Sequence, residues 1–303
     1  MASDSLKLST LPPLERPFRI AHLSDVHFRR IEHPAVVEAL VDEVNAADVG
    51  LVALSGDLTQ RARRREFEEA RAMIAAFGPP VVVVPGNHDV RAWWHNPVSR
   101  VWQSTSRFRE MISDIRVPVF MAPGIVAVGL NSAHGLTVKG GRIRPEALAE
   151  MERAFSAAPP DSFRVLVVHH HLLRLTALGD HDVSRGARRA LAAIRRSEVD
   201  LVLCGHLHRS HVESVEVAAP SAADADGYRL VVASAGTATS NRWRAENAGA
   251  NFYNWIDVAA DTFAVAERRF DPDTGTFTEA RRFEFVRNRP AVPAAEPPAS
   301  APR

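Results

Sequence analysis

The sequence predicts an α/β protein of four layers, in which two β-sheets pack face to face and helices cover both outer faces. Three observations lead to this class. Short aliphatic runs alternate with amphipathic runs through the first two thirds of the chain, which is typical of parallel strands joined by helices. From residue 211 onward the helical patterns stop and short strand-like runs follow one another. No stretch has the composition of a domain linker, so we expect a single domain over residues 18–287.

The first two thirds of the chain predict a mixed sheet. We expect strands at 18–23, 49–54 and 81–84, separated by helices at 34–46 and 65–77. Strands at 117–121 and 125–130 turn at Pro123 and Gly124. A helix at 145–157 begins with proline, which suits the first helical turn. A strand at 164–168, a helix at 184–196 and a strand at 199–204 complete this part.

The last third predicts a mostly antiparallel sheet. Its strand-like runs lie at 212–217, 228–233, 252–258, 263–270 and 276–286, and the segment 271–275 has the composition of a hairpin turn. We expect tails at 1–17 and 288–303, the second of them disordered because it is rich in Pro and Ala and has nothing to bury.

Composition excludes several classes of protein. The formal net charge of +1 provides no global basic field for nucleic acid or acidic lipid. A single cysteine, Cys204, rules out an intrachain disulfide framework. The longest aliphatic runs are strand-sized, far shorter than a membrane span, and the first residues lack a signal-peptide core. We therefore expect a cytoplasmic protein with no membrane or nucleic-acid partner.

Metal-ligand residue types follow five of the predicted strands directly. The carboxyl ends of parallel strands share one edge of a sheet, where ligands bind. Mixed oxygen and nitrogen donors suit a divalent metal of the Mn, Fe, Zn or Co type better than Mg or Ca. Residues spaced by two point the same way in an extended chain. The residues, strand by strand, are Asp25 and His27; Asp57; Asn87, His88 and Asp89; His169, His170 and His171; and His206 and His208.

The order D-x-H, G-D, G-N-H-D, H and G-H-x-H resembles the calcineurin-like metallophosphoesterases, and within them the bacterial class III cyclic-nucleotide phosphodiesterase-like enzymes. The resemblance covers residues 18–286 and implies an α/β/β/α sandwich of two mixed β-sheets flanked by helices. It also implies a dinuclear site. One metal would take Asp25, His27 and His208, the second would take Asn87, His169 and His206, and Asp57 would bridge them.

The resemblance further implies catalytic roles for His88, as the acid beside the scissile phosphate, and for Asp89, as the residue that orients it. One departure concerns the histidine run. Leu172 follows it where many relatives have a proline, so His170 stays open as an alternative ligand to His169.

These parts predict a dinuclear metal-dependent phosphodiesterase, in which a hydroxide bridging the metals attacks a small phosphorylated substrate such as a cyclic nucleotide. Arg242 and Trp243, on a loop of small residues, and Asn131, after the strand at 125–130, are candidate substrate contacts. A phosphomonoesterase, a nucleotide pyrophosphohydrolase, a DNA-repair-type nuclease and a non-catalytic scaffold stay open as alternatives. The physiological substrate, the metals and a homodimeric state are not decided by the sequence.

Overall fold

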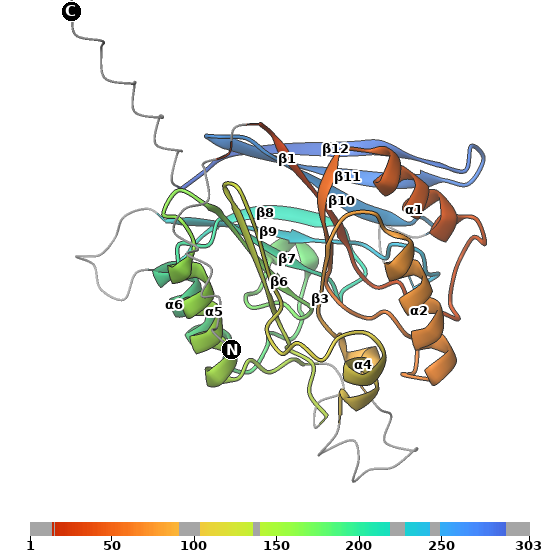
Figure 1. Cartoon of the computed structure of the whole chain (residues 1–303), viewed down its shortest axis with the longest axis horizontal. Helices are drawn as coiled ribbons and strands as arrows, with labels where there is room; N and C mark the ends of the chain where they lie inside the picture. The colour runs from red at the N-terminus through yellow and green to blue at the C-terminus, as the bar shows by residue number, and fades with distance from the viewer. Residues whose placement is uncertain are drawn as a thin grey trace, which may run out of the picture.

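The computed structural model describes residues 14, 16–90, 104–135, 140–218, 228–242 and 249–288. The tails predicted at 1–17 and 288–303 lie almost entirely outside the described residues, and Trp243 lies outside them too. The described residues form two six-stranded sheets packed face to face, with helices on their outer sides (Figure 1). The predicted fold class is confirmed.

The first sheet joins the two ends of the domain. Its strand order is β12-β11-β10-β1-β2-β3. Strand β1 lies at its centre because it pairs in parallel with β2 and antiparallel with β10. The strands are β1 (Phe18–Leu23), β2 (Val49–Leu54), β3 (Val81–Val83), β10 (Phe252–Val258), β11 (Thr262–Asp271) and β12 (Thr276–Val286).

The second sheet is built from the middle of the chain. Its strand order is β4-β5-β6-β7-β9-β8, with parallel pairs from β5 through β9 and antiparallel pairs at both edges. The strands are β4 (Val119–Ala122), β5 (Ile125–Leu130), β6 (Phe163–Val168), β7 (Leu201–Cys204), β8 (His211–Glu216) and β9 (Arg229–Ser234).

The predicted division of the strands between the sheets is wrong. The last three strands join β1 in the first sheet, while β8 and β9 extend the sheet that contains β4 to β7. Both sheets are therefore mixed. An apolar run indicates that a strand is buried on both faces. It does not indicate which strand lies beside it, so the sequence pattern alone does not assign the strands to one sheet or the other.

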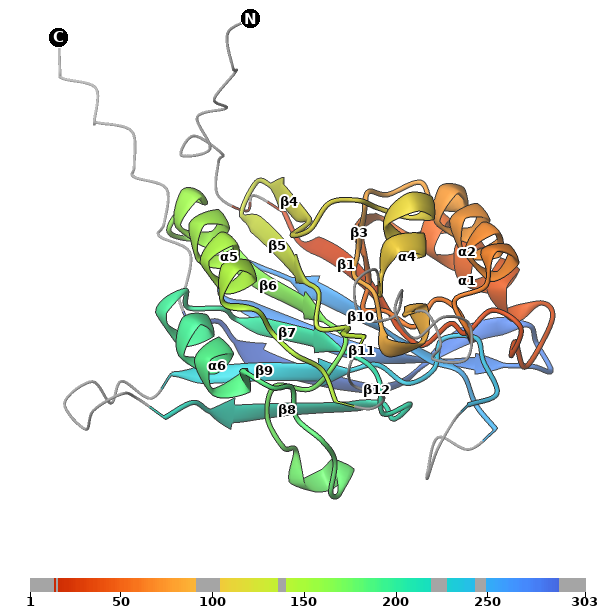
Figure 2. The same cartoon turned by 90° about the horizontal axis from the view of Figure 1, so that it is seen from below.

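Helices cover the two outer faces in layers (Figure 2). Helices α1 (Val36–Ala46) and α2 (Arg64–Ala76) lie on the first sheet, and α5 (Pro145–Ala157) and α6 (Ala187–Arg196) lie on the second. The short α4 (Ser106–Met111) packs against α2. Helix α1 buries Val36, Leu40 and Val44, which are spaced by four and so share one face.

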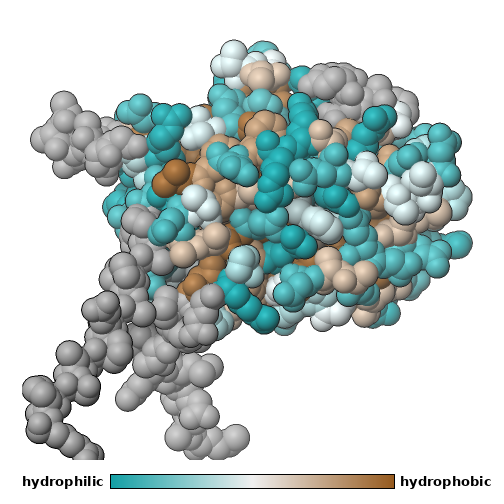
Figure 3. All heavy atoms as spheres, turned by 90° about the horizontal axis from the view of Figure 1, so that it is seen from above, coloured by the Kyte–Doolittle hydropathy of each residue, from teal (hydrophilic) through white to brown (hydrophobic). Residues whose placement is uncertain are grey.

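Strand residues alternate between separate apolar cores. In β6, Val165 and Val167 pack between the two sheets, whereas Leu166 and Val168 pack beneath α5 and α6. Hydrophilic residues dominate the face of the molecule shown in Figure 3, with apolar residues scattered among them. Within the described ranges, no helix is both long enough and apolar enough to cross a membrane.

Candidate metal centre

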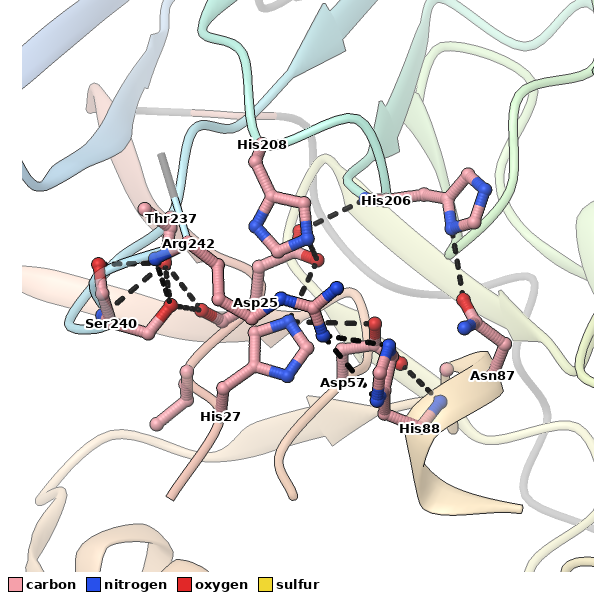
Figure 4. Close-up of polar contacts among 12 residues, drawn as sticks. Asp25, His27, Asp57, Asn87, His88, His206, His208, Thr237, Ser240 and Arg242 are labelled. Atoms are coloured by element: carbon pink, nitrogen blue, oxygen red, sulfur yellow. Dashed lines mark hydrogen bonds and ion pairs between the residues drawn. The ribbon is translucent and has the colours of Figure 1, made fainter. Parts of the chain in front are cut away.

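The loops after β1, β2, β3, β6 and β7 meet at one edge of the sandwich and bring the predicted ligands together (Figure 4). The first two loops run side by side, since Asp25 N donates to Gly56 O at 3.0 Å and His27 N donates to Asp57 O at 3.0 Å. A contact of 2.8 Å between His169 Nδ1 and Ser55 O connects the two sheets at this edge.

The backbone is strained where the ligands lie. Among the described residues, eight non-glycine residues have a positive φ, and five of them are predicted ligands. A left-handed conformation costs free energy for a residue with a side chain, and such residues cluster at functional sites. The five are Asp25 (54°), His27 (49°), Asp57 (54°), His206 (74°) and His208 (55°).

Two glycines allow backbone to approach the carboxylates closely. A Cβ atom at Gly86 would collide with the Asp57 carboxylate, and one at Gly205 would lie 2.5 Å from Asp25 Oδ2. Only glycine fits at both positions. Each glycine directly precedes a predicted ligand, Asn87 or His206.

One donor group surrounds Asp25. Its Oδ1 lies 3.5 Å from His27 Nε2 and 3.5 Å from His208 Nε2. His27 Nε2 lies 3.6 Å from Asp57 Oδ2. Atoms bound to one ion at 2.0–2.2 Å stand roughly 3.0–3.5 Å apart in tetrahedral or octahedral geometry, so these spacings fit a single cation.

A second donor group shares the same oxygen of Asp57. His169 Nε2 lies 3.4 Å from Asp57 Oδ2 and 3.1 Å from Asn87 Oδ1, and His206 Nδ1 lies 2.9 Å from that amide oxygen. Asp57 Oδ2 therefore faces nitrogens of both groups. This is the position a carboxylate needs in order to bridge two ions.

The hydrogen bonding leaves ligand atoms available. Backbone N–H groups hold one oxygen of each carboxylate, because His206 N donates to Asp25 Oδ2 at 2.9 Å and His88 N donates to Asp57 Oδ1 at 2.7 Å. Among the described residues, the buried atoms Asp25 Oδ1 and His27 Nε2 have no hydrogen-bond partner. Buried polar atoms are costly without partners, so these two atoms, which face each other at 3.5 Å in one donor group, fit a bound cation.

The electrostatics favour the metal-binding protonation states of Asp57, His206 and His208, whereas without a cation they favour the protonated form of His169. Burial pushes the pKa of Asp57 upward, but His169 and His88 outweigh it and hold this pKa well below its ordinary value. Burial lowers the pKa of His206 to about 4 and that of His208 to about 3, so both rings keep a free lone pair. Burial also opposes protonation of His169, but Asp57 raises its pKa to about 9.

The structure separates the histidines of the run. The His169 ring faces Asp57 and Asn87, whereas His170 Nδ1 contacts Ser132 Oγ at 2.8 Å. The His170 ring lies 4.6 Å from the ring of His206, and its Nε2 has no hydrogen-bond partner among the described residues. Of the two rings only that of His169 contacts Asp57 Oδ2, although ring nitrogens of His169, His170 and His206 all lie within 4.8 Å of one another.

The predicted role of Asp89 is wrong. Its buried carboxylate accepts hydrogen bonds from backbone N–H groups of Leu58, Thr59 and Gly86, and so ties the loop after β3 to the loop after β2. The His88 ring is held instead by Gln60, whose carbonyl oxygen accepts from His88 Nδ1 at 2.7 Å. A histidine and an aspartate that are adjacent in sequence point in different directions on this short 3₁₀ turn, Asn87–Asp89.

The loop after β9 brings Arg242 to the centre. Arg242 NH1 lies 2.7 Å from His88 Nε2, and Figure 4 shows the two side chains facing each other. The loop is anchored beneath the metal-ligand backbone, because Thr237 Oγ1 donates to Asp25 O at 2.7 Å and Thr239 Oγ1 donates to Val26 O at 2.9 Å. The sequence analysis missed these supports, although the run of small hydroxyl residues at 237–240 was a signal for them.

The other predicted substrate residues are placed differently. Asn131 Oδ1 accepts from Ala133 N at 2.8 Å, and this residue lines a cavity beside the centre. The third candidate, Trp243, lies outside the described residues.

Comparison with known proteins finds relatives of this chain among characterised phosphodiesterases. The chain is 24% identical over 215 residues to the 3′,5′-cyclic adenosine monophosphate phosphodiesterase CpdA of Escherichia coli, with 67% of this chain and 74% of CpdA covered. It is 26% identical over 208 residues to the glycerophosphodiester phosphodiesterase GpdQ of Enterobacter lignolyticus, and this match covers 62% of this chain and 70% of GpdQ.

The fold is similar to that of the purple acid phosphatase PPD1 from yellow lupin, with a TM-score of 0.67 at 10% identity. That match covers 92% of this chain and 55% of the lupin protein. The sequence model of the calcineurin-like phosphoesterases matches residues 18–210. The chain therefore belongs to the calcineurin-like phosphoesterase family and is a metallophosphoesterase.

Proposed function

We propose that this protein is a phosphodiesterase that uses two divalent cations and acts on small phosphodiesters. The observation that carries the proposal is the position of Asp57 Oδ2, which faces His27 Nε2 at 3.6 Å and His169 Nε2 at 3.4 Å. One cation would be held by Asp25, His27 and His208, the other by Asn87, His169 and His206, and Asp57 would be shared by both.

Two cations at this centre would supply water activation and would neutralise charge on the phosphoryl oxygens. The mixed nitrogen and oxygen donors suit Mn, Fe, Zn or Co. Of the seven donor residues, Asp25 and Asp57 alone carry negative charge. Two dications would therefore leave the centre positive and attractive to an anionic diester.

His88 and Arg242 would act on the substrate itself. Both lie beside Asp57, and Arg242 NH1 donates to His88 Nε2 at 2.7 Å. A guanidinium in this place can donate charge-assisted hydrogen bonds to a phosphate oxygen. His88, held through Nδ1 by the carbonyl of Gln60, keeps its Nε2 directed at the same space. To give the leaving oxygen its proton, His88 would first take up a proton at Nε2, in place of the contact from Arg242, and we assign the acid role to that protonated form.

The relatives support a diester as the substrate, since CpdA and GpdQ are both named as phosphodiesterases. Cyclic nucleotides are the first substrates to test because CpdA is named for one. Phosphomonoesters are the alternative that the test must separate, because the same metal chemistry serves both classes.

The test is hydrolysis of bis-p-nitrophenyl phosphate by the purified full-length chain with Mn²⁺, compared with the chelated protein and with p-nitrophenyl phosphate. Diester turnover that chelation abolishes supports the proposal, and cyclic nucleotides follow as substrates. Turnover of the monoester alone would replace the proposal with a phosphomonoesterase. An inert protein with both metals demonstrably bound would overturn it.

A further inference from the structure

A cavity of about 670 Å³ lies next to the metal centre. It is lined by the end of β3, by α4 and the segment that follows it, by the loop after β5 and by the first turn of α5. A cavity of this size accepts a group as large as a nucleotide.

Two links connect the lining of the cavity with the residues around the metal centre. Pro85 lines it and stands two residues before Asn87 in the chain. The second link begins at Arg142, which also lines the cavity: Arg142 N donates to Ser132 O at 2.9 Å, and the Ser132 hydroxyl contacts the His170 ring. The rest of a substrate whose phosphate binds at the metals can therefore extend into this cavity.

Four arginines line the cavity, namely Arg109, Arg116, Arg142 and Arg144, against the two carboxylates of Asp114 and Glu146. All four are exposed at its rim. Arg116 lies 4.0 Å from Glu150, but within the described part of the chain the other three arginines have no carboxylate within ion-pair distance. This positive rim belongs to a protein whose overall net charge is only +1.

Two further features favour an anion here. The N-terminus of the 13-residue helix α5 opens at the cavity, and the positive end of a helix dipole attracts negative charge. Residue Arg144 precedes that helix, where a cation is otherwise disfavoured. The walls contributed by Val84, Pro85 and Phe108 are apolar, so the site suits an organic group that carries its charge at one end.

We propose that this cavity binds the non-reacting half of the substrate, and that this half carries a second phosphate. The inference rests on the proposed phosphodiesterase function and narrows its substrate class. A cyclic mononucleotide has no second charged group and would leave the arginine rim unused.

The binding test uses the Mn²⁺-loaded full-length protein and two probes, thymidine 5′-monophosphate and thymidine 3′,5′-bisphosphate. Calorimetry gives the ratio of their dissociation constants, in which the contribution of the metal centre cancels. We expect the bisphosphate to bind about tenfold more tightly, as one charge-assisted contact allows, and less so at high salt. Arg144→Gln and, separately, Arg142→Gln should reduce the ratio. Arg153→Gln, on the same helix but outside the cavity, should not.

The kinetic test uses the p-nitrophenyl ester of thymidine 5′-phosphate with and without a 3′-phosphate, so that the reacting diester and leaving group are identical. We expect the 3′-phosphate to raise kcat/KM about tenfold, the same factor by which it should tighten binding. Equal turnover of both esters with equal binding of both probes would overturn the cavity proposal and leave the phosphodiesterase intact. If neither ester reacts but the bisphosphate keeps its advantage in binding, the phosphodiesterase proposal fails and the cavity stands. An advantage that survives in both arginine variants would overturn the assignment to this rim.

Discussion

Replacing Thr237 by valine tests whether the loop after β9 holds the metal-ligand backbone in place. The Thr237 hydroxyl is fully buried, donates to Asp25 O at 2.7 Å and accepts from Ser240 N at 3.2 Å. Valine has nearly the same shape but removes both hydrogen bonds, together with the 2.5 Å contact between Thr237 Oγ1 and Ser240 Oγ. Asp25 O would keep only the 3.3 Å contact with Ser240 Oγ, and Ser240 N would lose its partner inside the protein.

The expected cost follows from those two groups. Ser240 N is left without a partner, which costs about 1–3 kcal/mol, and Asp25 O loses the shorter of its two hydrogen bonds, which costs about 1 kcal/mol, so Thr237→Val should lower the free energy of unfolding by about 2–4 kcal/mol. Thr237→Ser is the matched control, because it keeps the hydroxyl and loses one buried methyl group, which costs about 1 kcal/mol. Asp25 has a left-handed φ of 54°, so loosening its carbonyl should also weaken metal binding, by about 10-fold or more.

The assay is urea unfolding followed by circular dichroism in the presence of a chelator, which keeps metal binding out of the stability measurement. Metal affinity is then measured by titration of the chelated protein. If the valine and serine variants have the same stability and the same metal affinity, the reasoning about this hydroxyl is refuted.

Three further predictions concern single side chains. Asp57→Ala should lower metal content and reduce diester turnover by more than about 100-fold. The control Asp273→Ala, in the exposed hairpin, should change neither quantity. Full activity of Asp57→Ala would contradict the role of Asp57 as a shared ligand. His88→Ala should retain both metals and lose about 10²–10⁴-fold in rate with alkoxide leaving groups but less with p-nitrophenolate, and an equal loss with both would refute the acid role. Burial raises the pKa of Asp200 from 3.8 to about 6, so the folded state favours the protonated acid and loses stability as pH rises through 6. The free energy of unfolding of Asp200→Asn relative to wild type should therefore increase by roughly 2–3 kcal/mol between pH 4.5 and pH 8, and a pH-independent difference in urea unfolding would disprove the shift.

Local patterns were sufficient for much of the fold. The bounds of β1, β5, α5 and β10 agree with the predicted ranges 18–23, 125–130, 145–157 and 252–258. These elements combine a long run of one periodicity with a clear boundary, such as Pro145 at the start of α5. The division into sheets was not predictable in this way, because hydrogen bonding between β1 and β10 joins residues far apart in the chain.

For the candidate site, too, some features could be predicted from local sequence and others depended on tertiary structure. The sequence by itself determined which residue types stand behind each strand, because the carboxyl ends of the parallel strands β1, β2, β3, β6 and β7 meet at one edge, whichever sheet each strand joins. It also determined the overall α/β class. Only the tertiary structure decided that His169 rather than His170 faces Asp57, since neighbouring residues in a loop turn their rings in directions that depend on contacts from elsewhere.

The tertiary structure likewise decided the supports of the site. Asp89 accepts hydrogen bonds from backbone N–H groups and does not contact the His88 ring. Gln60 holds that ring through its backbone carbonyl group. Because every residue has such a carbonyl group, no sequence motif indicates this contact. The arginine rim of the cavity combines Arg109 of α4 and Arg116 just after it with Arg142 and Arg144, which directly precede α5, and a strand pair separates the two groups in sequence. Motifs report chemistry that depends on residue type, whereas orientation, support and enclosure depend on long-range packing, which a local pattern does not contain.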